Sequence, residues 1–94
     1  MSADERMVSL SNTIKTGEKA AQVLENSEFN RNFDIIMEGI EKDLMQVDTS
    51  DEKKMISVVT EYHVAAKFKA RLVALMEDGR RSKTMLSKLI DKIR

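Results

Sequence analysis

The chain contains no cysteine, no proline and no tryptophan among its 94 residues. Without cysteine it can form no disulfide framework, thiolate metal site or cysteine nucleophile, and this absence predicts a cytosolic protein. Without proline, and with only three glycines, it has few residues that break helices. Its 34% content of charged residues is typical of long helices. The composition therefore predicts an all-α fold.

Net charge is also absent, because 16 basic residues balance 16 acidic ones. The charges nevertheless gather in two regions. Residues 28–52 carry about eight acids against two bases, and residues 80–94 about six bases against one acid. No apolar run approaches the roughly 18 residues of a membrane span, and the N-terminus is acidic where a signal peptide is basic. We expect a soluble protein that is not secreted and does not enter a membrane.

The N-terminal quarter of the chain has only a weak helical pattern. Met7, Leu10 and Ile14 lie at helical spacing, which predicts a short helix within residues 1–17 that is flexible or ordered only by a partner. Gly17 predicts a break, and a second short helix follows it up to Glu25.

The centre of the chain predicts an antiparallel helical hairpin over residues 27–47 and 50–78. Asn26 or Ser27 can cap the first helix by accepting a hydrogen bond from a free backbone N–H. Thr49, with Glu52 three residues later, matches a capping box and predicts the start of the second helix. Because the connection is short, the two helices should fold back on each other. The apolar positions of the first helix recur at steps of three and four: Phe29, Phe33, Ile36, Ile40, Leu44 and Val47.

Gly79 is the natural end of the second helix, because glycine tolerates the left-handed conformation that closes many helices. Glu77 and Asp78 oppose the dipole of a helix that ends there, so a continuous helix is the alternative. Residues 80–94 predict a basic amphipathic C-terminal helix that either folds back or projects. The whole chain, residues 1–94, is interpreted as a single helical domain.

The residues give little support for catalysis. His63 is the only histidine and has no second histidine or cysteine beside it, so it is interpreted as structural. Asp34, Glu38 and Glu41 share one helix face, but hard cations need more oxygens than one helix offers. The three glycines stand alone and form no phosphate cradle. The sequence therefore predicts no catalytic residue, no cofactor and no metal site.

Two charged helix faces are candidates for binding a partner. The acidic face carries Asp34, Glu38 and Glu41. The basic face could meet the acidic helix of this molecule or of a neighbouring copy, or an acidic protein partner. Nucleic acid and membrane are less favoured because residues 80–94 include no aromatic residue. The basic residues are Arg80, Arg81, Lys83, Lys88 and Lys92.

Two segments together resemble small helical proteins that tailed bacteriophages encode near their head and packaging genes. They are AAQVLENSEFNRNFDIIMEGIEKDLM and DEKKMISVVTEYHVAAKFKARLVALMEDGRRSK, within about residues 19–83. The features that carry the resemblance are the Leu-x-Asn step at residues 24–26, the anchors Phe29 and Phe33, and the acid-glycine-base step at residues 78–80.

The resemblance implies an accessory protein without enzymatic activity that binds other proteins. It would act at the head, portal or neck of a virion or during assembly, in the host cytoplasm or the particle, as a homo-oligomer or part of a larger assembly. Two alternatives remain. One is a regulator or counter-defence protein whose acidic helix, with Asp34, Glu38, Glu41 and Asp43, occupies a nucleic-acid groove of a host protein. The other is a nucleic-acid binder that uses the basic C-terminal residues.

Overall fold

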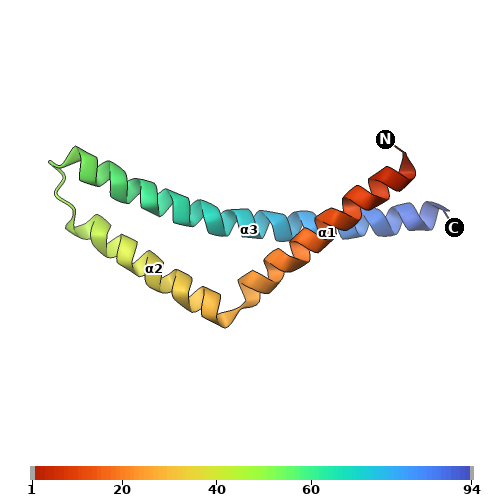
Figure 1. The fold of residues 1–94 in the computed structure, drawn as a ribbon, viewed down its shortest axis with the longest axis horizontal. Helices are drawn as coiled ribbons and strands as arrows, with labels where there is room; N and C mark the ends of the chain where they lie inside the picture. The colour runs from red at the N-terminus through yellow and green to blue at the C-terminus, as the bar shows by residue number, and fades with distance from the viewer. Residues whose placement is uncertain (1, 94) are drawn as a thin grey trace. The chain divides into compact units, whose positions relative to one another are not determined.

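The computed structural model describes residues 2–93, which form three helices and no strand (Figure 1). They are α1 (Ala3–Glu25), α2 (Ser27–Gln46) and α3 (Glu52–Ile93). The predicted all-α fold is confirmed. Within the described residues, no helix combines the length and the apolar character that crossing a membrane requires.

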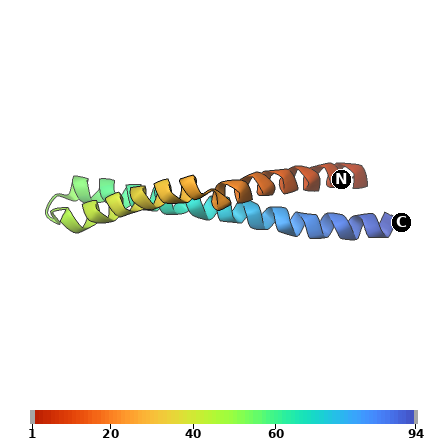
Figure 2. The same ribbon diagram turned by 90° about the horizontal axis from the view of Figure 1, so that it is seen from below.

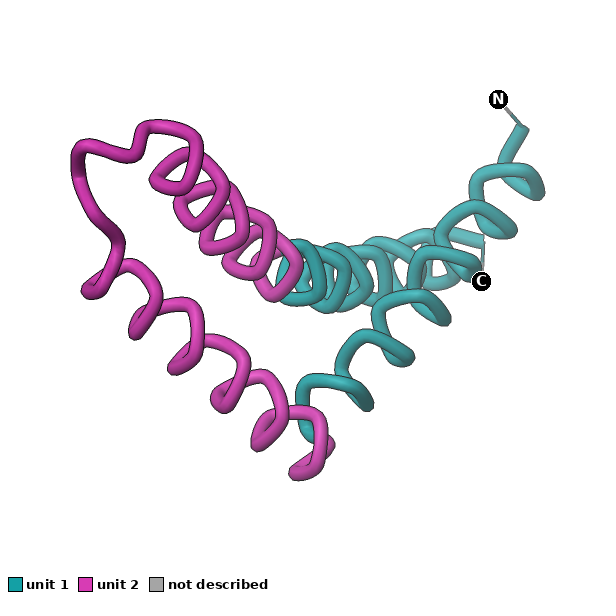
Figure 3. The backbone as a smooth tube through the Cα atoms, turned by 60° about the vertical axis from the view of Figure 1, so that its left-hand side comes forward, with its two compact units in different colours: residues 1–25, 71–94 teal, residues 26–70 magenta. Residues whose placement is uncertain are grey.

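The helices divide into two compact units, which Figure 3 colours separately. Unit 1 contains α1 and the part of α3 from residue 71 onward, and unit 2 contains residues 26–70. Because α3 is one continuous helix of 42 residues, it contributes to both units.

Unit 1 is a pair of antiparallel helices, with the start of α1 and the end of α3 at the same end of the pair (Figure 2). Its buried residues, among those described, are all small: Gly17, Ala20, Gly79 and Ser82. A Cβ added at Gly17 would lie 2.7 Å from the Cα of Gly79 and 2.8 Å from the carbonyl oxygen of Leu75. The two backbones are therefore in contact where the glycines meet.

This contact explains why the break predicted at Gly17 was wrong and why, at Gly79, the alternative of a continuous helix is the one that the structure shows. Gly17 does not separate two short helices, because α1 runs through it. Gly79 does not end a helix, because α3 runs through it to Ile93. Neither glycine has a positive φ. Because neither glycine has a side chain, the two helices can pack closely at these positions. The expected separate C-terminal helix, residues 80–93, is the last part of α3. Arg94 lies outside the described residues, as does Met1.

Unit 2 contains the predicted helical hairpin. α2 begins after Asn26, whose side-chain Oδ1 accepts a hydrogen bond of 2.9 Å from the backbone N–H of Phe29. Asn26, and not Ser27, is thus the cap. α2 runs antiparallel to residues 52–70 of α3, and this pairing brings Phe29 against Phe68.

The turn between α2 and α3 differs from the predicted capping box. Asp51 is the cap of α3, because its Oδ1 accepts a hydrogen bond of 3.1 Å from the backbone N–H of Lys54. Before it, Asp48 accepts two hydrogen bonds from Ser50, from the backbone N–H at 2.9 Å and from the hydroxyl at 2.7 Å. Asp51 therefore caps α3, the role that the sequence pattern assigned to Thr49.

Candidate functional site

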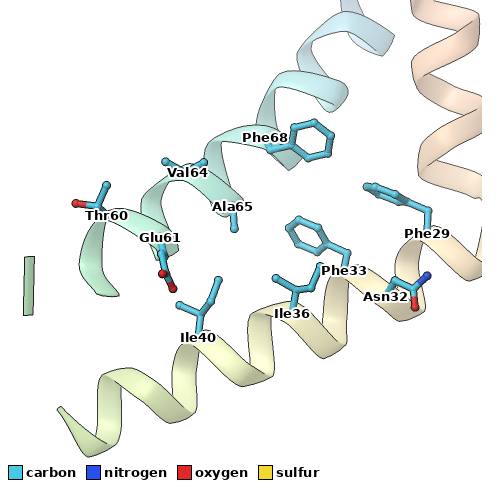
Figure 4. A pocket seen from close by; sticks show the side chains of 10 residues that line it. All are labelled: Phe29, Asn32, Phe33, Ile36, Ile40, Thr60, Glu61, Val64, Ala65 and Phe68. Atoms are coloured by element: carbon cyan, nitrogen blue, oxygen red, sulfur yellow. The ribbon is translucent and has the colours of Figure 1, made fainter. Parts of the chain in front are cut away.

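The most prominent feature of unit 2 is an open apolar groove between α2 and α3, with a volume of about 620 Å³ (Figure 4). Glu61 and Ala65 of α3 point toward α2 across it, and Phe33, Ile36 and Ile40 of α2 point toward α3. Thr60 and Val64 do not point toward α2 in this view. The lining residues are Phe29, Asn32, Phe33, Ile36 and Ile40 from α2, and Thr60, Glu61, Val64, Ala65 and Phe68 from α3.

Three phenylalanine rings form one end of the groove. The rings of Phe29 and Phe33 stack with centroids 5.9 Å apart, and the ring of Phe68 lies 6.3 Å from that of Phe29 at a tilt of 47°. These separations are within the range that favours aromatic pairs. The Nζ atom of Lys69 lies 5.1 Å from the centroid of Phe33, which is a cation–π geometry.

The apolar side chains that line the groove are more exposed than they would be in a closed hydrophobic core. Phe68 is 51% exposed, Ile36 is 56% exposed and Val64 is 63% exposed. Among the described residues of unit 2, only Ile40 and Val58 are buried hydrophobic side chains. Burying apolar surface is worth about 25 cal/mol per Å². A partner that covers these side chains would therefore gain binding free energy from apolar surface that the hairpin itself does not bury.

The few polar groups at the groove do not form a reaction centre. The hydroxyl of Thr60 donates a hydrogen bond of 2.6 Å to the carbonyl oxygen of Ile56 in its own helix. Within residues 2–93 no group of three His, Asp or Glu side chains is placed to hold a metal ion. His63 is exposed, and its ring meets that of Tyr62 edge-on at 6.3 Å. The surroundings of the groove suit recognition of an apolar surface.

The acidic residues chosen from the sequence lie outside the groove. Asp34, Glu38 and Glu41 are exposed on α2, and none of them lines the groove. Their register places them on the side of the helix away from Asn32 and Ile36. They form a solvated helix face.

The basic residues chosen from the sequence are exposed along the end of α3, in unit 1. Arg81 forms an ion pair with Asp78 one turn earlier in the same helix. Arg80 and Lys83 border a shallow hollow beside Ile14 and Glu18 of α1. The remaining two, Lys88 and Lys92, lie one turn apart on the same face.

Sequence reasoning found the apolar residues that α2 contributes to the groove but not the groove itself. Phe29, Phe33 and Ile36 belong to the predicted apolar stripe of α2, and Val64 and Phe68 lie in the apolar-rich start of α3. The spacing of these apolar residues along the sequence is the same whether their side chains pack against each other or face solvent. The signal that was available is the breadth of the apolar face on residues 55–76, which exceeds what one neighbouring helix can cover.

No protein-family model, curated protein or solved structure matches this chain.

Proposed function

We propose that this protein is a non-enzymatic interaction module that binds protein chains through the apolar groove of unit 2. The observation that carries the proposal is the phenylalanine cluster at one end of an open apolar groove. Phe68 of this cluster, and Ile36 and Val64 beside it, are each more than half exposed. Contiguous apolar patches with a polar border mark interaction sites on soluble proteins. Aromatic anchors gathered in one pocket are typical of the residues that dominate binding energy.

A helical segment is the ligand shape that such a groove fits best. The groove runs between two antiparallel helices, and an amphipathic helix can place its apolar face into a groove of this kind. The lining offers few hydrogen-bonding groups to a polar small molecule, since most of the lining residues are hydrophobic.

We further propose that the protein is a phage-type accessory protein of the virion head, portal or neck, or of assembly. The support is the sequence resemblance over about residues 19–83. In that setting the groove is the surface that meets other copies or a phage structural protein, and the protein works by contact alone.

A cross-linking experiment tests the groove as the binding surface. Because the chain has no cysteine, the variant Asn32→Cys carries a single thiol at the groove for a benzophenone probe. The matched control, Lys15→Cys, places the same probe on the exposed surface of α1. Both would be irradiated alone and in a mixture with candidate phage head, portal and neck proteins.

We expect protein adducts from the Asn32→Cys probe and few from the Lys15→Cys probe. Mass spectrometry of the adducts then separates another copy of this chain from a different protein. Equal yields at both positions, or no protein adduct at either, would contradict the proposal.

A further inference from the structure

The groove is bordered by acidic side chains on α2 and by basic side chains on α3, and Glu61 is the one charged residue among those that line it. On α2, Glu28 lies four residues before the lining residue Asn32, and Asp43 lies seven after the lining residue Ile36. On α3, Lys53 lies seven residues before the lining residue Thr60, and Lys67 seven after it. Residues at these spacings share a helix face.

These four charged side chains are all exposed. The edge formed by Glu28 and Asp43 is called the acidic rim here, and the edge formed by Lys53 and Lys67 the basic rim. Because the rims lie on opposite helices of one groove, a matching partner needs a basic edge and an acidic edge in the same arrangement.

The exposed apolar side chains of unit 2 extend the same face. Ile35 is 56% exposed and Ile56 is 66% exposed, and their register places each beside a rim, Ile35 on α2 and Ile56 on α3. With Ile36, Val64 and Phe68 they form a broad apolar surface between and beside the charged rims. This face is therefore an exposed apolar surface that is bordered by acidic side chains on one side and by basic side chains on the other.

We propose that the occupant of the groove is the same groove of a second copy, packed face to face so that α2 of each copy lies on α3 of the other. This proposal rests on the proposed function of the groove and names its partner. A two-fold contact places the same surface patch on both sides, so each patch must be complementary to itself. A groove with one acidic and one basic rim meets that condition.

The charges also select the orientation of the pair. A two-fold axis parallel to the helices places the acidic rim of one copy on the basic rim of the other at both edges. An axis across the helices would place α2 on α2 and bring acidic rim against acidic rim. Like charges placed face to face oppose association, so the first orientation is favoured.

The positions along the helices agree with that orientation. Phe29 meets Phe68 in the hairpin, so Glu28 of one copy comes level with residues near Lys67 of the other. Asp43 lies fourteen residues after Phe29, and Lys54 lies fourteen before Phe68. Because α-helices rise equally per residue, Asp43 comes level with Lys53 and Lys54. Both acids of the rim therefore meet bases.

A charge-swap experiment tests the partner. One variant carries Glu28→Lys and Asp43→Lys, which makes both rims basic. A second variant carries Lys53→Glu and Lys67→Glu, which makes both rims acidic. All four positions are exposed, so we expect the helix content to stay unchanged by circular dichroism.

Sedimentation velocity at low salt is the measurement. We expect the wild-type chain to form a dimer, each variant alone to dissociate with a Kd at least about tenfold higher, and an equimolar mixture of the two variants to recover the dimer. The control carries Asp34→Lys and Glu41→Lys, the same change of charge on the other side of α2, and should dimerise like the wild type.

Four results would overturn this proposal. A monomeric wild-type chain at about 100 μM, far above the Kd of a stable dimer, would remove it. Loss of the dimer in the control, or no recovery in the mixture, would show that the rims do not pair. Adducts of the Asn32→Cys probe with a different protein and none with a second copy would keep the groove as a binding surface while rejecting this occupant.

Discussion

Gly17 and Gly79 occupy the positions where the backbones of α1 and α3 touch. The contact leaves no room for a side chain at Gly17, because the nearest atoms are backbone atoms that cannot rotate away. Gly39, on α2, is the matched opposite, since a Cβ added there would meet nothing within 4 Å. The same residue type therefore has opposite consequences at two helical positions.

Substitution by alanine should separate the two cases. We expect Gly17→Ala to destabilise the fold by about 2 kcal/mol or more, because the helices must move apart to admit the methyl group. Gly39→Ala should stabilise it by about 0.5 to 1 kcal/mol, because alanine is the better helix former. Urea unfolding followed by circular dichroism measures both. Equal effects of the two substitutions would show that the close contact in unit 1 does not support stability.

Asp48 provides a second prediction at the scale of single residues. The hydroxyl and the backbone N–H of Ser50 both donate hydrogen bonds to its carboxylate, and they hold the pKa of Asp48 below its ordinary value. A lowered folded-state pKa means that the ionised form favours folding. This contribution is present above the ordinary aspartate pKa and is lost as the pH falls through the folded-state pKa.

The variant Ser50→Ala should raise the pKa of Asp48 part of the way toward its ordinary value, because the hydroxyl bond, the larger cause, is lost. Carboxyl ¹³C NMR over an acid titration measures the change. An unchanged pKa of Asp48 would show that the Ser50 hydroxyl bond does not form in solution.

At the scale of helices, the sequence predicted the helical type of the elements and the central hairpin, but it divided α1 and α3 at glycines that both helices run through. Apolar residues at steps of three and four identified α2 and the start of α3, and the polar segment at Asn26 and Ser27 marked where α2 begins. These signals are local, so they can be read along the chain. The roles of Gly17 and Gly79 are not local, because a glycine that ends a helix and a glycine that admits a neighbouring helix look alike in one dimension.

The groove was out of reach of sequence analysis for a related reason. Phe68 and Val64 lie in an apolar stretch that is compatible with a closed core, and only the structure shows them more than half exposed. The charged clusters stood out in the sequence and were chosen as binding residues instead. Charge is visible residue by residue, whereas an incomplete core depends on which apolar faces meet.

The start of α2 allows a direct test of a cap that the sequence left between two residues. Asn26→Ala should cost about 1 kcal/mol, because the backbone N–H of Phe29 loses its acceptor. Ser27→Ala should change stability by no more than a few tenths of a kcal/mol, because Ser27 is inside the helix and alanine favours helices. Denaturant unfolding of both variants decides between them, and a larger loss from Ser27→Ala would move the cap by one residue.

At the scale of the whole molecule, the helices within unit 1 and the helices within unit 2 pack by different kinds of contact. Unit 1 buries small residues and brings two backbones into contact. Unit 2 leaves most of its large apolar side chains partly or largely exposed. Regions with few buried apolar contacts open more readily than well-packed ones. We therefore expect unit 2 to open more readily than unit 1, although both units share α3.

Hydrogen exchange at two protein concentrations about a hundredfold apart should show this difference. Binding of a second copy stabilises the folded state by mass action, so amides in α2 and in residues 52–70 should exchange more slowly at the higher concentration. Amides around Gly17 in α1 should keep their rates, because unit 1 does not form the proposed contact. The variant Val64→Asp, which places a charge in the groove at a position 63% exposed, should abolish the concentration dependence while leaving the low-concentration rates in unit 1 unchanged. Slowing that is equal in α1 and α2, or that survives in Val64→Asp, would place the contact between copies outside the groove.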